Sequence, residues 1–233
     1  MHLSAIKTRL MKPSENLKDF LLEHTQIHEG DVIAISTKLF SYAENRIFAV
    51  TDKAQVSHLI EQEAQERYPG KYFDMCLKHG LWVANAGIDD SNSPAETVVL
   101  WPKDPQASID QLHRDLKLQS GVQNFGLIMV DTICSPLRKG VTGAGLCVAG
   151  FKNIISKIGK PDLYGRPLAY TTIGVADSLA ACANLLMGEA DEKTGIVKIT
   201  NCDLIEFTSK YYDSIKSASM DKNDCVFKPI FKF

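Results

Sequence analysis

The chain has 233 residues, with 26 basic and 28 acidic side chains and a formal net charge of −2 at pH 7. This balance argues against a nucleic-acid-binding protein that relies on a broad basic surface. No apolar stretch approaches the roughly 20 residues that span a bilayer, so we expect no membrane partner. The first 12 residues include three basic side chains but no apolar run, which is unlike a secretory signal.

The six cysteines are widely separated and form no C-x-x-C pair, which leaves zinc-knuckle and thioredoxin-type sites without support. They are Cys76, Cys134, Cys147, Cys182, Cys202 and Cys225. We expect reduced thiols in a cytoplasmic protein, most of them small core residues.

In the first third of the chain, apolar spacing predicts two helices and one strand. Ser14 is a candidate N-cap for a helix whose apolar residues recur at helical spacing from Leu17. Residues 32–35 form a short apolar run typical of a buried strand. Residues 52–67 carry apolar side chains on one side and charges on the other, which predicts an amphipathic helix stopped by the Pro-Gly pair at 69–70.

The middle of the chain alternates between predicted strands and helices. Residues 81–84 read as a strand, a polar loop follows at 85–94, and residues 97–100 read as another strand. Apolar residues at helical spacing predict a helix over 105–118. The run at 125–130 is continuously apolar, as expected for a strand covered on both faces.

Beyond a glycine-rich stretch at 140–150, the pattern predicts a helix over 175–187, ended by Gly188, and a strand over 196–200. Strands and helices alternate without strict βαβ regularity, so the expected class is α/β in the broad sense, a mixed α+β domain. We expect one domain over residues 1–202 and a C-terminal extension of unknown role over 203–233.

Oxygen-bearing side chains follow several of these elements. Asp131 comes directly after the run at 125–130, where α/β proteins commonly place ligands, and Thr132 is beside it. Asp89 and Asn92 lie in the polar loop, and Glu189 follows the helix that ends at Gly188. Such ligands from separate loops suit Mg²⁺ or Mn²⁺. A structural role is also open, in which Asp131 caps a turn and Asp89 and Asn92 form an Asx turn.

Common catalytic and nucleotide-binding motifs are absent from the sequence. There is no G-x-x-x-x-G-K-[ST] loop and no G-x-S-x-G elbow, and the glycines at 140, 143 and 145 are in the wrong order for a dinucleotide fingerprint. The spacing does not support a Cys134–His79 thiol pair. Five basic side chains are candidate contacts for an anionic ligand: Lys38, Arg46, Arg138, Lys139 and Arg166. Each of them could equally be an ordinary surface charge.

The run Gly80-Leu-Trp-Val-Ala-Asn-Ala-Gly-Ile-Asp-Asp-Ser-Asn92 resembles a hallmark of the coenzyme F420 gamma-glutamyl ligase family. Further stretches are similar to this family in the same order, and the resemblance covers about residues 5–200. They are residues 36–46, 100–105, 130–132 with 138–140, 162–166, and 187–189. Members of the family use GTP to add glutamate to a deazaflavin cofactor.

The resemblance implies a ligase-like α/β fold with a mixed sheet, assembled as an intertwined homodimer. It implies divalent metal, Mg²⁺ or Mn²⁺, held by Asp89, Asp131, Thr132 and Glu189. It also implies nucleotide binding near the segment from Arg9 to Lys12 and at other positions. The expected nucleotide contacts are Leu10, Met11, Thr37, Lys38, Tyr42, Asn92, Met187, Gly188, Glu189 and Thr194.

The sequence departs from the family pattern at two places. Tyr42 follows Ser41 where the family usually has Lys, and Cys134-Ser135 stand where it tends to have Gly-Arg after the Asp-Thr pair. These changes remove cations expected near anionic ligands, so they affect which nucleotide and which acceptor fit.

The implied chemistry is amide formation, in which an acceptor carboxylate attacks the γ-phosphoryl group of GTP or ATP and L-glutamate displaces phosphate from the acyl phosphate. Lys38 and Arg138 are the candidate catalytic cations. Three interpretations are open: a ligase for the deazaflavin coenzyme, a ligase for a folate, and a nucleotide- or metal-binding homologue without catalysis.

Overall fold

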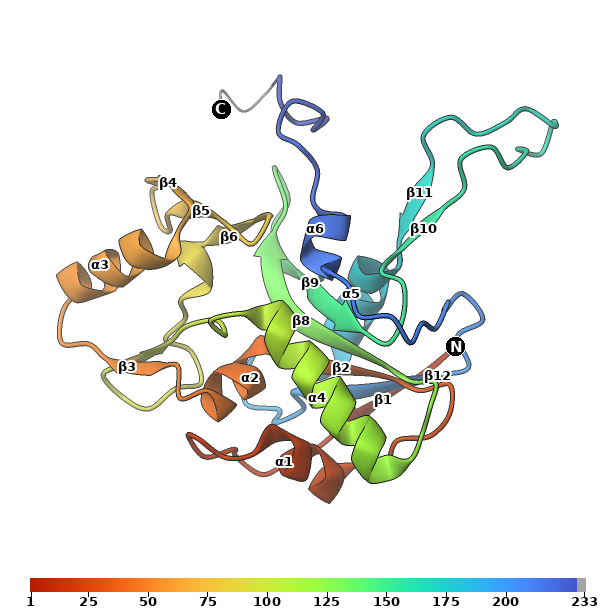
Figure 1. Cartoon of the computed structure of the whole chain (residues 1–233). Helices are drawn as coiled ribbons and strands as arrows, with labels where there is room; N and C mark the ends of the chain where they lie inside the picture. Colours follow the sequence, from red (N-terminus) through yellow and green to blue (C-terminus); the bar gives the residue numbers. More distant parts are fainter. Residues whose placement is uncertain (230–233) are drawn as a thin grey trace.

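The computed structural model describes residues 1–229, which fold around a mixed five-stranded sheet with helices on both faces (Figure 1). The strands, in spatial order, are β1 (His2–Ile6), β12 (Ile196–Thr200), β2 (Val32–Ser36), β8 (Gly126–Cys134) and β9 (Val141–Ala149). β2 and β8 pair in parallel, and the other neighbours are antiparallel. The expected α/β class with a mixed sheet is therefore confirmed.

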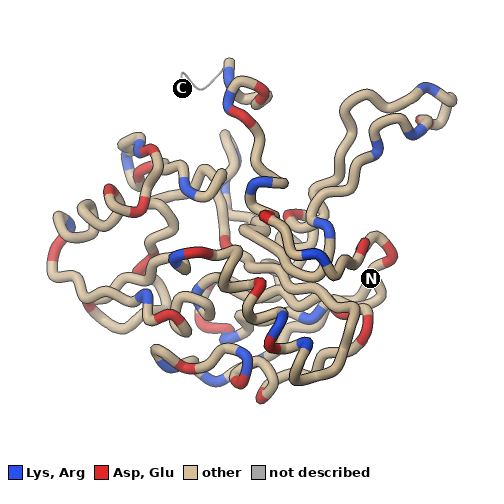
Figure 2. The backbone as a smooth tube through the Cα atoms, in the orientation of Figure 1, with Lys and Arg blue, Asp and Glu red and all other residues tan. Residues whose placement is uncertain are grey.

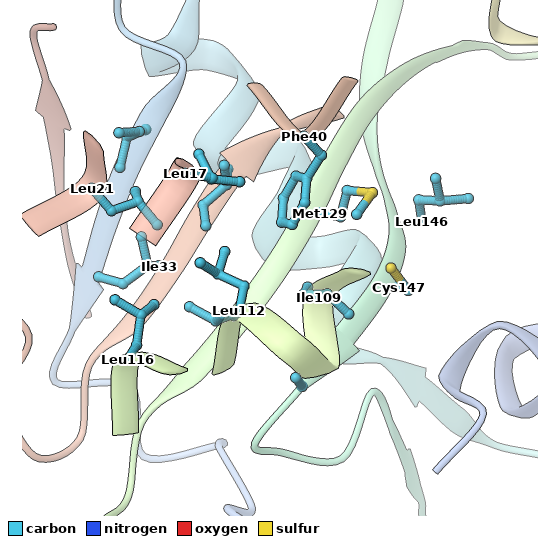
Figure 3. Packing of buried hydrophobic residues seen from close by; sticks show 14 of the residues in the cluster. Leu17, Leu21, Ile33, Phe40, Ile109, Leu112, Leu116, Met129, Leu146 and Cys147 are labelled. Carbon is cyan, nitrogen blue, oxygen red and sulfur yellow. The ribbon is translucent and has the colours of Figure 1, made fainter. Parts of the chain in front are cut away.

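Alternation along the central strands divides the core into two clusters, one on each face of the sheet. In β2, Ile33 and Ile35 pack on one face, with residues of α1 (Leu17–His24), α2 (Thr37–Ala43) and α4 (Pro105–Ser120). Figure 3 shows this cluster, with Phe40, Ile109 and Met129 among its members. Val32 and Ala34 face the opposite cluster, which contains α5 (Val175–Met187).

The glycine-rich stretch, which sequence reasoning left unassigned, forms β9 and serves as the packing surface of α5. A Cβ atom on Gly143 would lie 2.4 Å from the carbonyl oxygen of Ala180, and one on Gly145 would lie 2.9 Å from the methyl carbon of Ala176. Any side chain at these two positions would push the helix away from the sheet.

A small lobe beside the main sheet is formed by the segment between α2 and α4 (Figure 1). It contains α3 (Lys53–Glu63), the pair β3 (Ile47–Ala49) and β7 (Thr97–Val99), and the sheet of β4 (Glu66–Tyr68), β5 (Met75–Lys78) and β6 (Leu81–Ala84). The lobe has its own buried cluster, which includes Ile60, Cys76 and Leu100.

The strands β10 (Ile154–Ser156) and β11 (Thr172–Gly174) pair at the base of a long arm, residues 154–174, that extends from the body of the molecule (Figure 1). Four large apolar side chains of this arm are exposed: Ile158, Leu163, Tyr164 and Tyr170. Figure 2 shows Lys and Arg on the arm, and both signs of charge interspersed along the rest of the chain.

The C-terminal extension packs against the domain as far as Lys222. In what we call the strap (residues 205–222), Tyr211 pairs with His113 at 2.8 Å and Ser214, in α6 (Ser214–Ala218), accepts from the Val148 amide at 2.9 Å. Lys222 then forms an ion pair with Glu66 of the small lobe. The strap therefore ties α4 and β9 to β4.

Several sequence predictions need correction. Ser14 does not cap the first helix, because its φ is +61° and the Asn16 side chain accepts from the Asp19 amide instead. The helix predicted over 52–67 ends at Glu63, since residues 66–68 pair with β5 as a strand. The β8 strand continues to Cys134, so Asp131 lies within a strand rather than after one.

Among the six cysteines, which are all free thiols, only Cys76 and Cys147 are buried, so the expectation that most lie in the core is wrong. None of the helices in residues 1–229 is both long and apolar enough to cross a membrane.

Candidate functional site

The parallel pairing of β2 and β8 brings two chemically important residues to the same end of these two strands. Ser36, the last residue of β2, is in register with Val130 of β8. Lys38 lies two residues after Ser36 and Asp131 one residue after Val130, so both come just past the end of this parallel pairing. The carboxyl ends of parallel strands are where α/β sheets commonly bind ligands. The Ser36 side chain also accepts from the Lys38 amide at 3.4 Å and so begins α2.

The third side chain, Asp89, is presented by a turn with an uncommon backbone conformation. Asn85, Ala86 and Gly87 have φ values of +50°, +56° and +72°. Non-glycine residues in this region carry strain of about 1–3 kcal/mol each, and such strain clusters at functional sites. Asp89 then forms an isolated bridge with Val99, which fixes its backbone beside β7.

Asp89 and Lys38 form a charged group with Ser91. The Lys38 ammonium lies 2.7 Å from Asp89 Oδ2 and donates to the Ser91 hydroxyl and carbonyl oxygens at 2.8 and 3.0 Å. Ser91 donates to both carboxylate oxygens of Asp89, each at 2.8 Å. The pKa of Asp89 is lowered: burial alone would raise it, but the hydrogen bonds and charge of Lys38 and the Ser91 donors outweigh burial. The Asx-turn interpretation is correct for Asp89, and it coexists with the contact to Lys38.

The Asp131 carboxylate accepts one donor on each oxygen. Thr132 donates its backbone N–H to Oδ1 at 2.8 Å, and Trp101 donates its indole N–H to Oδ2. Burial is the main cause that raises the pKa of Asp131 to about 6, and the charge of Asp89 adds to it, while the two donors and Lys38 act in the opposite direction. The two carboxylates and Lys38 therefore influence each other electrostatically.

A partly buried ion network supports this region from the small lobe. Glu63 lies 2.6 Å from Arg46 through one oxygen and 2.6 Å from Lys78 through the other. Lys78, whose side chain is 4% exposed, also donates to the carbonyl of Ala86 at 3.2 Å, and Arg46 donates to the carbonyl of Trp101 at 3.0 Å. The network therefore links α3 to the strained turn and to Trp101.

The loop after α5 approaches the same region. Asn92 donates to the carbonyl of Ala190 at 2.8 Å, which joins the loop at residues 85–94 to the segment from Met187 to Thr194. Thr194 donates to the carbonyl of Met187 at 2.6 Å and closes that segment into a compact loop. Glu189 accepts from the Asn184 side chain at 2.9 Å.

The four expected metal ligands do not form one cluster. Within residues 1–229, no group of three or more His, Cys, Asp or Glu side chains lies close enough to hold a metal ion. Asp89 and Asp131 affect each other's charge, whereas strand alternation points Thr132 to the opposite face, toward α5, and Glu189 is bonded to α5. Two carboxylates that lack a third still fit Mg²⁺, which is usually held by one or two carboxylates together with substrate phosphates.

The expected nucleotide contacts lie in different environments. Leu10 is 72% exposed and Met11 is buried in the core, while Arg9 is paired with Glu15 and Glu23. Thr37 is buried beside Lys38, and Tyr42 is partly buried against the same core. Arg138 is exposed in the turn between β8 and β9, beyond Cys134, so the structure does not bring it to Lys38.

Sequence reasoning missed three residues of this site: Trp101, Ser91 and Lys78. Trp101 lies in one of the family-like stretches, but the sequence gives no sign that its N–H meets a carboxylate 30 residues away. An open pocket of about 330 Å³ is lined by residues of β6, β8, β9 and α5, Leu81 and Ile133 among them, and by none of the site residues named above. Ile133 is two residues beyond Asp131 on β8.

Residues 5–201 match the sequence model of a family described as F420-0:gamma-glutamyl ligase. The chain is 32% identical over 207 residues to the coenzyme F420:L-glutamate ligase of Methanopyrus kandleri, covering 81% of this chain and 82% of that protein. It is 31% identical over 224 residues to the protein of that name from Methanocaldococcus jannaschii, covering 88% and 89%. The corresponding protein of Methanothermobacter thermautotrophicus is 34% identical over 182 residues, covering 70% and 72%. The matched region contains Lys38, Asp89 and Asp131.

Proposed function

The chain belongs to the F420-0:gamma-glutamyl ligase family, and we propose that it adds L-glutamate to a terminal carboxylate of the deazaflavin coenzyme. The observation that carries the proposal is the group of Asp89, Asp131 and Lys38, which three separate elements bring to the end of the parallel pairing between β2 and β8. Two acids and one cation at this edge suit a substrate that combines phosphate and carboxylate groups.

In the proposed reaction, an oxygen of the acceptor carboxylate attacks the γ-phosphorus of GTP or ATP, and the bond to the β-phosphate oxygen breaks. The acyl phosphate that results then reacts with the amine of L-glutamate, which forms the amide and releases phosphate. Lys38 would contact a phosphate or carboxylate oxygen when substrate displaces it from Asp89. We keep Arg138 as a second candidate cation, one that a movement of the β8–β9 turn would have to bring in.

A divalent cation, Mg²⁺ or Mn²⁺, would be held by Asp89 and Asp131, and it would offset the negative charge of the nucleotide phosphates when bound. Thr132 and Glu189 would join it only after a rearrangement at α5. The nucleotide would extend from Lys38 toward Asn92 and the segment from Met187 to Thr194, which are already bonded to one another.

We also propose that the protein is a homodimer, in which the arm packs against a second copy of the chain. The support is the exposure of its apolar side chains: Leu163 is 100% exposed, Tyr170 91% and Tyr164 85%. Apolar side chains grouped on a projecting segment are typical of an interaction surface.

An assay with two acceptors tests the proposed function. The protein is incubated with Mg²⁺ or Mn²⁺, GTP or ATP, L-glutamate, and either the deazaflavin coenzyme or a folate, and product mass is followed together with phosphate release. We expect one or more glutamyl units on the deazaflavin with stoichiometric phosphate. Glutamylation of the folate alone would assign the other acceptor, and binding of nucleotide without any turnover would indicate a homologue that has lost catalysis.

A further inference from the structure

Trp101 has a place in the site that ordinary core packing does not explain. Its side chain is 2% exposed, and its indole N–H donates to Asp131 Oδ2. Indole is a donor without acceptor capacity, and a buried N–H that lacks a partner destabilises the fold. Phe or Leu could fill a core position without burying an N–H that needs a hydrogen-bond acceptor.

The surroundings fix the ring in the plane that makes this hydrogen bond. A Cβ atom on Gly87 would lie 2.4 Å from Cε2 and 2.5 Å from Nε1 of the indole, so the glycine leaves room for the ring. The Lys78 ammonium is 5.4 Å from the ring centroid, and the His79 ring lies at 6.2 Å with an interplanar angle of 18°. Arg46 holds the backbone carbonyl of the same residue.

The hydrogen bonds leave Asp131 ready to accept a cation. One donor occupies each carboxylate oxygen, Thr132 on Oδ1 and Trp101 on Oδ2, and each oxygen keeps a free lone pair. A donor on each oxygen also restricts rotation of the carboxylate about its last bond. Groups that orient a metal ligand in this way change metal affinity by roughly 10- to 100-fold when they are removed.

We infer that Trp101 is a positioning residue that holds the Asp131 carboxylate in the orientation that binds the divalent cation. The inference rests on the proposed function, because it presupposes that Asp131 is a metal ligand. It goes beyond that function by assigning a role in cation binding to an aromatic core residue through its N–H.

The test is Mn²⁺ binding by the full chain, measured with Mn²⁺ alone and with a non-hydrolysable nucleotide. Trp101→Phe keeps a ring and removes the N–H donor, and Trp82→Phe is the matched control, since the sequence has two tryptophans. We expect the dissociation constant for Mn²⁺ to rise roughly 10- to 100-fold in Trp101→Phe and to stay within about twofold in Trp82→Phe. In turnover, we expect a higher KM for metal with kcat recovered at saturating metal.

A spectroscopic signature and an isosteric replacement keep the test independent of folding. In the Trp82→Phe background, Trp101 is the sole tryptophan, and we expect Mn²⁺ to quench its fluorescence saturably. If Trp101→Phe folds poorly, benzothienylalanine at this position in the same background retains the ring shape without the N–H, and the same loss of affinity is expected.

The outcomes separate the inference from the proposed function. If Asp131→Asn abolishes Mn²⁺ binding while both N–H-deleted proteins bind as tightly as the wild type, the positioning role is wrong and the metal site stands. If the wild type binds no Mn²⁺ with or without nucleotide, the metal dependence of the proposed function fails, and the role of Trp101 is rejected with it.

Discussion

At the scale of single residues, the ionised Asp131 carboxylate lowers the stability of the folded state and is available to bind a ligand. Its folded-state pKa is about 6, above the ordinary value of 3.8, chiefly because of burial. A group whose pKa is raised on folding favours the native state below its unfolded pKa, and this contribution is lost as pH rises from about 3.8 through about 6. At neutral pH the charged form therefore destabilises the metal-free protein.

Asp131→Asn is expected to reduce the affinity for Mg²⁺ or Mn²⁺ at least about tenfold, because an amide oxygen lacks the charge of a carboxylate. The unfolding temperature of the metal-free protein at pH 7 should stay the same or rise. The control is Asp90→Asn, which changes the exposed neighbour of Asp89. Calorimetric titration and thermal unfolding measure both effects, and equal metal affinity in the two variants would remove Asp131 from the site.

Gly87→Ala and Gly121→Ala form a pair that separates backbone strain from steric conflict. Both glycines have similar left-handed φ values, +72° and +75°, but only Gly87 has the Trp101 ring in the way. We expect Gly121→Ala to cost about 1–2 kcal/mol in the free energy of unfolding. Gly87→Ala should cost a further 1–3 kcal/mol or so through overpacking and should also weaken metal binding. Equal costs in denaturant unfolding would show that the ring moves aside freely.

At the scale of elements, the sequence predicts the helices and strands whose apolar residues recur with a clear period. It does not predict those that form only by pairing or packing with residues far away in the chain. The strand at Val32–Ser36 and the helix at Val175–Met187 are confirmed, because each carries a clear apolar pattern. The pair β10–β11 and the strand β4 have no such pattern and are fixed by pairing. The strand β9 was missed because its glycines are required by the close approach of α5.

Some residues of the candidate site could likewise be predicted from the sequence and others could not. The acidic residues could be chosen from their positions after predicted strands and from the family resemblance, and the structure does bring Asp89, Asp131 and Lys38 together. The hydrogen bond from Trp101 could not be predicted, because it depends on the tertiary packing around Gly87. The sequence likewise gives no sign that Glu189 accepts from the Asn184 side chain in α5.

The partly buried network centred on Glu63 predicts a substantial effect of Glu63 on stability. Glu63→Gln removes the charge that pairs with both Arg46 and Lys78. Breaking a fully buried pair typically costs about 3–5 kcal/mol, and we expect the low end of this range because Glu63 and Arg46 are 20% and 18% exposed. The control on the same helix, Glu61→Gln, has an exposed side chain and should change the free energy of unfolding by less than about 1 kcal/mol. Chemical denaturation at pH 7 measures both.

The same network has a defined pH dependence. Burial alone would raise the pKa of Glu63, but its hydrogen bonds and charges from Lys78 and Arg46 outweigh burial and lower it below 4.5. A carboxyl group with a lowered pKa stabilises the fold above its unfolded value, and this contribution is lost as pH falls through the folded value. The difference in stability between the wild type and Glu63→Gln should therefore shrink below about pH 4.5. A constant difference down to pH 3 would contradict this account.

At the scale of the whole molecule, two segments extend beyond the sheet and its helices. The strap fastens α4 and β9 to the small lobe, whereas the arm packs on the core only at its base, through Ile155 and Ile173, and exposes its apolar side chains over residues 158–170. Replacing residues 158–170 by a short turn should convert a dimer into a monomer in light scattering, with the unfolding temperature of the remaining domain largely retained. A monomeric wild type, or a dimer that survives the deletion, would refute the role of the arm.

The central claim is that the group of Asp89, Asp131 and Lys38 promotes phosphorylation of an acceptor carboxylate. The most direct measurement uses a deazaflavin acceptor labelled with oxygen-18 in its terminal carboxylate, with a nucleoside triphosphate, L-glutamate and Mg²⁺. We predict that one labelled oxygen per turnover appears in the released phosphate with the wild type and with Asp90→Asn, and that Asp131→Asn transfers none. Amide product without label in the phosphate, or equal transfer by Asp131→Asn, would contradict the account.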